Sequence, residues 1–214
     1  MRVEQLAERL LNAFPQLDAR ERRIALAVYR ELARGAPVEQ QVLAQRCAVP
    51  VEEMTATLRA WPGVFFDEAQ RIIGFWGLTI RPMAHRLRLD GRELYAWCAW
   101  DTLFLPRLIG EPARVESRCR ATGEALALTV EADRVETTLP SLALSFVAPE
   151  AAAAKADIVT SFCHHVHFFR TAQAARQWIG GRPGFYELAL ADAFELGRSV
   201  NAAMYGEALS YGPS

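Results

Sequence analysis

Residues 94–105 read LYAWCAWDTLFL, and this segment is apolar around its whole circumference if it is helical. Such a segment is expected to be buried on all sides. We predict a helix from Glu93 to Leu105 that ends at Pro106, because proline disrupts a helix interior. Cys98 and Asp101, three positions apart, would then lie on one helix face at about 5–6 Å between Cβ atoms. A thiol and a carboxyl group would share an apolar wall.

The segments that follow residue 80 have the alternation and turn residues that are typical of strands. Two further helical segments come near the C-terminus, after an alanine-rich stretch at 151–156. The pattern predicts an α+β fold, with a mixed or antiparallel sheet and flanking helices. The predicted strands are Ala84–Leu89, Arg114–Cys119, Ala125–Glu131, Ser141–Val147 and Phe162–Phe169, and the later helices are Thr171–Ile179 and Asp192–Tyr205.

Residues 1–80 are predicted to form a helical, winged-helix-like domain, with residues 81–214 as the α+β core. Helices are expected at Val3–Phe14, Arg20–Arg34, Val38–Cys47 and Val51–Ala60, and a hairpin at Val64–Trp76. A winged helix often binds DNA, but residues 1–80 carry ten arginines and ten acidic residues. A segment without net positive charge has little electrostatic attraction for DNA, so a structural role is favoured for residues 1–80.

The composition excludes several classes of function. Hydrophobic residues make up 51% of the 214 residues, and the net charge is -1, which gives no bulk attraction to nucleic acid or anionic membranes. No apolar run approaches the roughly 20 residues that span a bilayer. The N-terminus is too charged for a signal peptide, so we expect a cytoplasmic protein. In a reducing compartment its four cysteines would remain thiols.

Asp101 is the one ionisable carboxylate in the apolar segment at 94–105. A buried carboxylate costs several kcal/mol unless its pKa rises or it gains a hydrogen-bond partner, and such a group can move protons. The alternative is structural: Asp101 would bond a nearby backbone amide, and Cys98 would only fill the core.

A second cluster of chemical groups occurs at residues 161–169, which read SFCHHVHFF and include three of the four histidines. On a strand, Cys163, His165 and His167 would face one side, and His164 the other. A zinc site is the obvious alternative, but structural zinc sites usually have four ligands in recognisable pairs, and no second pair exists. Spacing alone cannot show whether Cys98 and Cys163 meet.

At these residues the sequence resembles the organomercurial lyases, also called alkylmercury lyases, of bacterial mercury resistance. The matching stretches lie within residues 94–110, 113–123 and 161–169, in the order found in the family. The resemblance implies an enzyme that cleaves carbon–mercury bonds and a catalytic trio of Cys98, Asp101 and Cys163 that also holds the mercury. By the same resemblance Cys119 is structural. Some members carry a second cysteine where this chain has His164, whereas Cys47 matches no family motif.

The chemistry of mercury fits these residue types. Mercury is a soft cation that prefers thiolates over imidazole and carboxylate. Asp101 could accept a thiol proton and return it to carbon, without an organic cofactor. Trp97, Trp100 and Phe104 are candidate walls for the organic group, and His165 and His167 could support the site. Small thiols and mercuric reductase are expected to take the Hg²⁺ product.

Two other functions remain open at this point. A metal-sensing regulator would bind DNA through the first domain and metal through Cys98 and Cys163, although the neutral charge of that domain argues against it. A zinc-dependent or redox enzyme would be built instead on the cluster from Cys163 to His167.

Overall fold

The N-terminal part of the chain is helical, as its apolar periodicity predicts. The structure, a computed structural model, describes residues 3–148 and 157–210. Asp18 and Glu21 form a reciprocal capping box that fixes the start of the second helix. The first four helices are α1 (Val3–Ala13), α2 (Ala19–Leu32), α3 (Gln40–Cys47) and α4 (Val51–Ala60).

Eight strands form one antiparallel sheet, in the order β1-β2-β3-β5-β4-β6-β7-β8. Hairpin connections join most neighbours, and β5 pairs with both β3 and β4. The strands are β1 (Val64–Phe66), β2 (Ile72–Phe75), β3 (Leu78–Thr79), β4 (His85–Leu89), β5 (Arg92–Ala96), β6 (Ala113–Arg118), β7 (Ala125–Val130) and β8 (Val135–Glu136).

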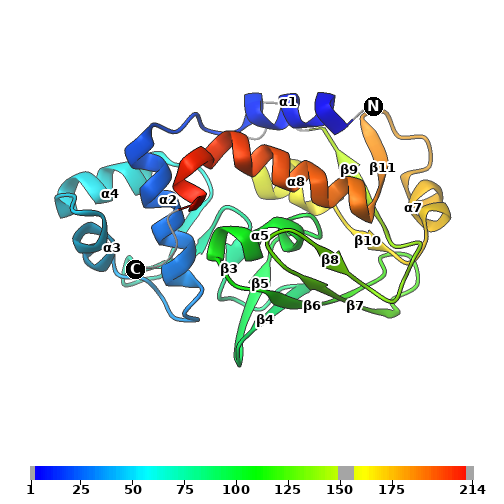
Figure 1. The fold of residues 1–214 in the computed structure, drawn as a ribbon, viewed down its shortest axis with the longest axis horizontal. Coiled ribbons are helices and arrows are strands. Elements are labelled where there is room, and N and C mark those ends of the chain that lie inside the picture. Colours follow the sequence, from blue (N-terminus) through cyan, green and yellow to red (C-terminus); the bar gives the residue numbers. More distant parts are fainter. Residues whose placement is uncertain (1–2, 149–156, 211–214) are drawn as a thin grey trace.

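This large sheet has a charged face and an apolar face, as the alternation in β4 predicts. Leu87 and Leu89 are buried, whereas Arg86 and Arg88 pair with acidic side chains of the neighbouring strands. Helix α5 (Asp101–Ile109) contacts both β7 and the long helix α8 (Leu190–Tyr205). It therefore lies between the large sheet and α8 (Figure 1).

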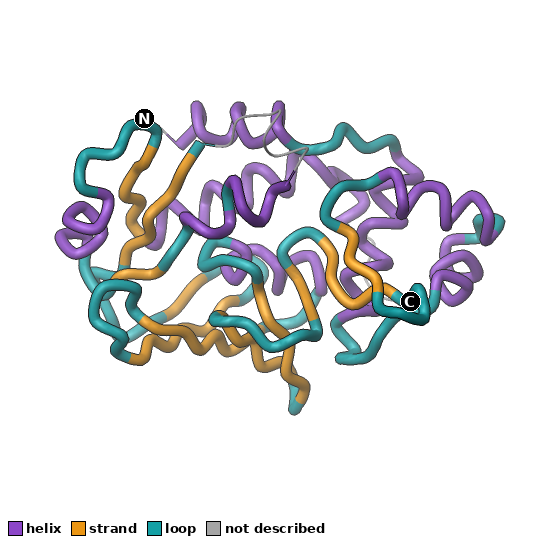
Figure 2. The backbone as a smooth tube through the Cα atoms, turned by 180° about the vertical axis from the view of Figure 1, so that it is seen from behind, coloured by secondary structure: helices purple, strands orange, loops and turns teal. Residues whose placement is uncertain are grey.

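A second sheet of three antiparallel strands, β10-β9-β11, lies at the end of the molecule away from α3 and α4 (Figure 2). Its strands are β9 (Ala143–Val147), β10 (Phe168–Phe169) and β11 (Phe185–Ala189), and α7 (Ala172–Ile179) packs against it. The predicted α+β class is confirmed, and the sheets are antiparallel.

The helix predicted over Glu93–Leu105 is wrong in its first half. Residues 92–96 form β5, a turn follows, and α5 begins only at Asp101. A segment that is apolar on all sides fits a buried helix or a strand that lies between two other strands. Residues 92–96 form a strand because they pair with both β3 and β4. The helix also continues through Pro106 with the loss of one backbone hydrogen bond, and ends at Ile109, where Gly110 adopts a φ of 88°.

The strand predicted over Phe162–Phe169 is also largely wrong. Residues 163–165 form a short 3-10 turn, η1, and only Phe168–Phe169 pair as a strand. The local bond from the Val166 N–H to the Cys163 carbonyl replaces a strand pairing. The predicted alternation of side chains across a strand therefore does not apply to the histidines.

Residues 1–80 and 81–214 share the large sheet, because β3 from the first part pairs with β5 from the second. Helices α3 and α4 and the β1–β2 hairpin occur where the sequence predicts them. The winged-helix classification and the two-domain division stay predictions. The alanine-rich stretch at 151–156 lies outside the described residues. In the described chain, no helix is long and apolar enough to cross a bilayer.

Candidate active site

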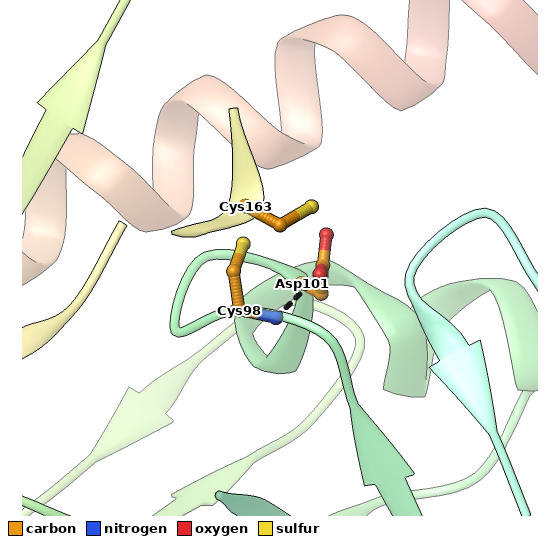
Figure 3. Close-up of side chains that lie close together, drawn as sticks. All are labelled: Cys98, Asp101 and Cys163. Carbon is orange, nitrogen blue, oxygen red and sulfur yellow. Dashed lines mark hydrogen bonds between the residues drawn. The ribbon is translucent and has the colours of Figure 1, made fainter. Parts of the chain in front are cut away.

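Cys98 and Asp101 lie at the junction between β5 and α5. Cys98 belongs to the turn after the strand, and Asp101 is the first residue of the helix. The backbone N–H of Cys98 donates a hydrogen bond to Oδ2 of Asp101 at 2.8 Å (Figure 3). The two residues are therefore close, but through a turn and not along a helix face as predicted.

Cys163 reaches the same place from a distant part of the chain, on the η1 turn. The N–H of Ala99 donates to the Val166 carbonyl at 3.2 Å, which joins the turn after β5 to the end of η1. On the other side of η1, the buried Ser145 of β9 donates its hydroxyl to the His165 carbonyl at 2.8 Å. Hydrogen bonds to the backbone therefore hold both cysteine turns in place.

The three predicted residues converge. One ligand atom from each of Cys98, Asp101 and Cys163 lies within 4.8 Å of the other two. Figure 3 shows both sulfur atoms and the carboxyl group directed toward a common space. Each residue is at most 5% exposed. Among the described residues this is the one group of three or more Cys, His, Asp or Glu side chains close enough to share a metal ion.

Burial determines the protonation of all three groups. It raises the pKa of Asp101 to about 7, although hydrogen bonds from Cys98 oppose the rise. Burial also raises the pKa of the Cys98 thiol well above its usual range, and Cys163 and the Asp101 charge add to this effect. The Cys98 thiol lowers the pKa of Cys163, but burial and the Asp101 charge outweigh it, so that pKa is raised. Near neutral pH both thiols are protonated, and a large fraction of Asp101 is ionised and can accept a proton.

Gly77 gives the Asp101 carboxyl its space. A Cβ atom at this position would lie 2.7 Å from Cγ of Asp101, closer than real Cβ contacts. The φ of Gly77 is 95°, which other residues rarely adopt. Its carbonyl accepts the N–H of Trp97 at 2.9 Å, which fixes the turn that carries Cys98.

An apolar cavity of about 70 Å³ adjoins the site, several times the ~10–15 Å³ that one water needs. The three aromatic residues predicted as walls all line it, together with Asp101 and Cys163. Residues from both ends of the chain complete it. The cavity is lined by Ala13, Phe14, Pro15, Tyr29, Pro62, Trp76, Gly77, Trp97, Trp100, Asp101, Phe104, Ile158, Phe162, Cys163, Val200, Asn201, Met204 and Tyr205.

Residues 78–201 match the family model described as alkylmercury lyase. The chain is 40% identical to an alkylmercury lyase of Streptomyces lividans over 94% of each chain. It is 44% identical to one of Staphylococcus epidermidis, over 80% of this chain and 78% of that protein. The chain belongs to the alkylmercury lyase family. A crystal structure of the mercury-bound form of MerB2 has the same fold, with a TM-score of 0.72, 24% identity, and coverage of 95% of this chain and 98% of that one.

Cys163 is the one cysteine of this alkylmercury lyase family member among the described lining residues, and Cys98 lies beside it; Cys119 and Cys47 lie outside both the trio and the lining. Cys119 follows β6, is 2% exposed, and its Sγ accepts the N–H of Arg170 at 3.4 Å. That contact fits the structural role that the resemblance implies. Cys47 ends α3 and is half-buried against the core.

The histidines beyond Cys163 do not line the cavity with their side chains. The His165 ring contacts Phe185, and the His167 ring contacts Trp178. Their contribution is through the backbone, because Ser145 binds the His165 carbonyl and accepts the His167 N–H at 3.1 Å. Cys163 and these histidines do not form a joint metal-binding group among the described residues.

Several cavity residues were not singled out from the sequence. Tyr29, on α2, donates its hydroxyl to the Trp76 carbonyl at 2.9 Å, and Tyr205 is hydrogen-bonded to Tyr29. Asn201 is a polar residue on the buried stripe of α8, and this signal could have been noticed. Gly77 offers no comparable signal, since glycine is ordinary in a turn.

Proposed function

We propose that this protein is an alkylmercury lyase that cleaves the carbon–mercury bond of R-Hg⁺ and releases R-H and Hg²⁺. The observation that carries the proposal is the convergence of two thiols and a buried carboxyl group beside an apolar cavity. Soft thiolates are the ligands that mercury prefers. The cavity offers aromatic and aliphatic surface to the organic group R.

The reaction begins when one cysteine binds R-Hg⁺ through its sulfur and its proton leaves with the displaced counter-ligand. Asp101 then accepts the proton of the second thiol, and that thiolate adds to mercury. Electron density moves into the carbon–mercury bond, and the Asp101 carboxyl returns the proton to carbon as R-H leaves. Hg²⁺ remains bound between Cys98 and Cys163.

The apolar surroundings support both halves of this cycle. They raise the pKa of Asp101 to about 7, so the same group can accept a proton and donate it near neutral pH. A low local dielectric also strengthens the contacts between thiolate, mercury and carboxyl. The proposed cycle uses no organic cofactor.

Release of the product requires help from outside the chain. Two soft ligands hold Hg²⁺ tightly, so we propose that small thiols remove it. Transfer to mercuric reductase, as the family resemblance implies, is the proposed next step for the metal.

The test is release of benzene from phenylmercuric acetate with excess small thiol, followed by gas chromatography. Cys98→Ser and Cys163→Ser should each lower turnover at least about 100-fold, because each removes a mercury ligand. Cys119→Ser is the matched control: turnover should stay within about threefold of wild type, with a stability loss of about 1–2 kcal/mol. Full turnover by Cys163→Ser would exclude the two-thiolate mechanism.

A further inference from the structure

Asn201 is a buried polar residue in the cavity wall, and the proposed reaction does not use it. It is 4% exposed, and its Nδ2 has no hydrogen-bond partner among the described residues. A buried amide N–H without an acceptor costs free energy, because it has lost its hydrogen bonds to water. Such a cost is offset if a bound molecule supplies the acceptor.

The position of Asn201 follows from how α8 packs against α5. The Ala193 carbonyl accepts the Trp100 indole N–H at 2.9 Å. One turn later, Gly197 approaches Phe104 so closely that a Cβ would lie 3.1 Å from Cβ of Phe104. Residues four apart share a helix face, so Asn201 continues this face at the next turn and lines the cavity.

The two tyrosine hydroxyl groups of this wall already have partners. Tyr29 donates its proton to the Trp76 carbonyl, and Tyr205 is bonded to Tyr29. The indole N–H groups of Trp76 and Trp100 donate to the Pro62 and Ala193 carbonyls, and Asp101 and Cys163 belong to the proposed chemistry. Among the residues that the structure describes, Asn201 is the one amide side chain in the lining, and its Nδ2 can donate a hydrogen bond to a bound molecule.

We propose that Asn201 is a specificity-determining residue that donates a hydrogen bond to a neutral oxygen, an ether or a hydroxyl, on the organic group of the substrate. A carboxylate is disfavoured, because an anion loses its hydration in the apolar cavity and meets the ionised Asp101 there. This inference rests on the proposed lyase activity. The cavity would then have an apolar part for the hydrocarbon portion of the substrate and a hydrogen-bonding subsite at Asn201.

The test is a competition between two substrates of nearly equal shape, 3-methoxypropylmercury and n-pentylmercury, in one vial with excess thiol. The ratio of 1-methoxypropane to pentane measures the ratio of the two kcat/KM values. Asn201→Leu should lower this ratio about fivefold, the equivalent of one ordinary hydrogen bond. Tyr205→Phe, which changes another polar group of the same wall, should leave the ratio at the wild-type value.

Stability provides a second readout. Because Nδ2 has no hydrogen-bond partner among the described residues, Asn201→Leu should unfold at or above the wild-type temperature. An unchanged product ratio in Asn201→Leu, a ratio lowered only in Tyr205→Phe, or a clear loss of melting temperature in Asn201→Leu would each overturn the proposal. If wild type released neither product, the lyase proposal itself would fail, which is a separate result.

Discussion

Asp101 shows how burial turns an ordinary carboxyl group into one that can exchange protons near neutral pH. It lies at the start of α5 and accepts one backbone N–H, yet burial still raises its pKa to about 7. The two features expected of a buried carboxylate, a hydrogen-bond partner and a raised pKa, are both present. The carboxyl bonds a nearby amide, and it has the shifted pKa of a proton carrier.

The pH dependence of turnover tests this residue. Ionised Asp101 accepts the thiol proton, so kcat/KM for phenylmercuric acetate should rise as the pH increases through about 7. Asp101→Asn should lower turnover at least about 100-fold and lose this rise. Asp133→Asn, at an exposed loop position, should keep the wild-type profile. A wild-type rise retained by Asp101→Asn would assign the titration to another group.

At the scale of elements, the site is made of turns at the ends of strands. Cys98 follows β5, Cys163 lies on η1, and Gly77 lies between β2 and β3. The space for the Asp101 carboxyl depends on the missing side chain of Gly77.

Gly77→Ala should therefore damage the site more than an alanine at another glycine with a positive φ would. Gly91→Ala is the matched control, since Gly91 has a φ of 77° and a methyl group there would meet nothing within 4 Å. Both should lose about 1–2 kcal/mol of stability from backbone strain. Only Gly77→Ala should also lower kcat, about tenfold or more, because a displaced carboxyl is misplaced for proton transfer. Equal kcat values for the two variants would show that Gly77 does not position Asp101.

The sequence predicted most of the elements, because their signals are local. The capping box at Asp18 and Glu21 marks α2, and the alternation in 84–89 marks β4. The helix predicted from Glu93 was wrong up to residue 100, because the stretch 94–100 is apolar throughout and has no periodicity that separates helix from strand. The η1 turn was missed because a short stretch of aromatic and histidine residues resembles a strand. The hydrogen bonds that Ser145 makes to residues 165 and 167 come from a distant segment and leave no local signal.

At the scale of the whole molecule, the cavity joins segments from both ends of the chain. Phe14 and Tyr29 come from the N-terminal helical part, and Asn201 and Tyr205 come from α8. The resemblance identified the trio, but nothing local in the sequence places these four residues around it. One contribution of the first 80 residues is therefore to close the cavity.

Burial of Asp101 also affects the stability of the whole molecule. Its pKa is 3.8 when unperturbed and about 7 in the folded protein, so folding favours the protonated form. The contribution of protonated Asp101 to the free energy of unfolding is fully present below about pH 4 and is lost as the pH rises through about 7. The difference between the two pKa values corresponds to about 4 kcal/mol.

Urea unfolding of wild type and Asp101→Asn across this pH range measures the effect. Asp101→Asn should gain up to about 4 kcal/mol relative to wild type between pH 4 and pH 8, because an amide does not ionise. A constant difference across this range would contradict the raised pKa.

Protonation of the substrate carbon is the central chemical claim. It is tested most directly by turnover of phenylmercuric acetate in D₂O with excess small thiol, with the released benzene analysed by mass spectrometry. Thiol and carboxyl protons exchange with solvent, so wild type should release benzene that carries one deuterium. Unlabelled benzene, or no benzene, would contradict proton transfer from these groups to carbon.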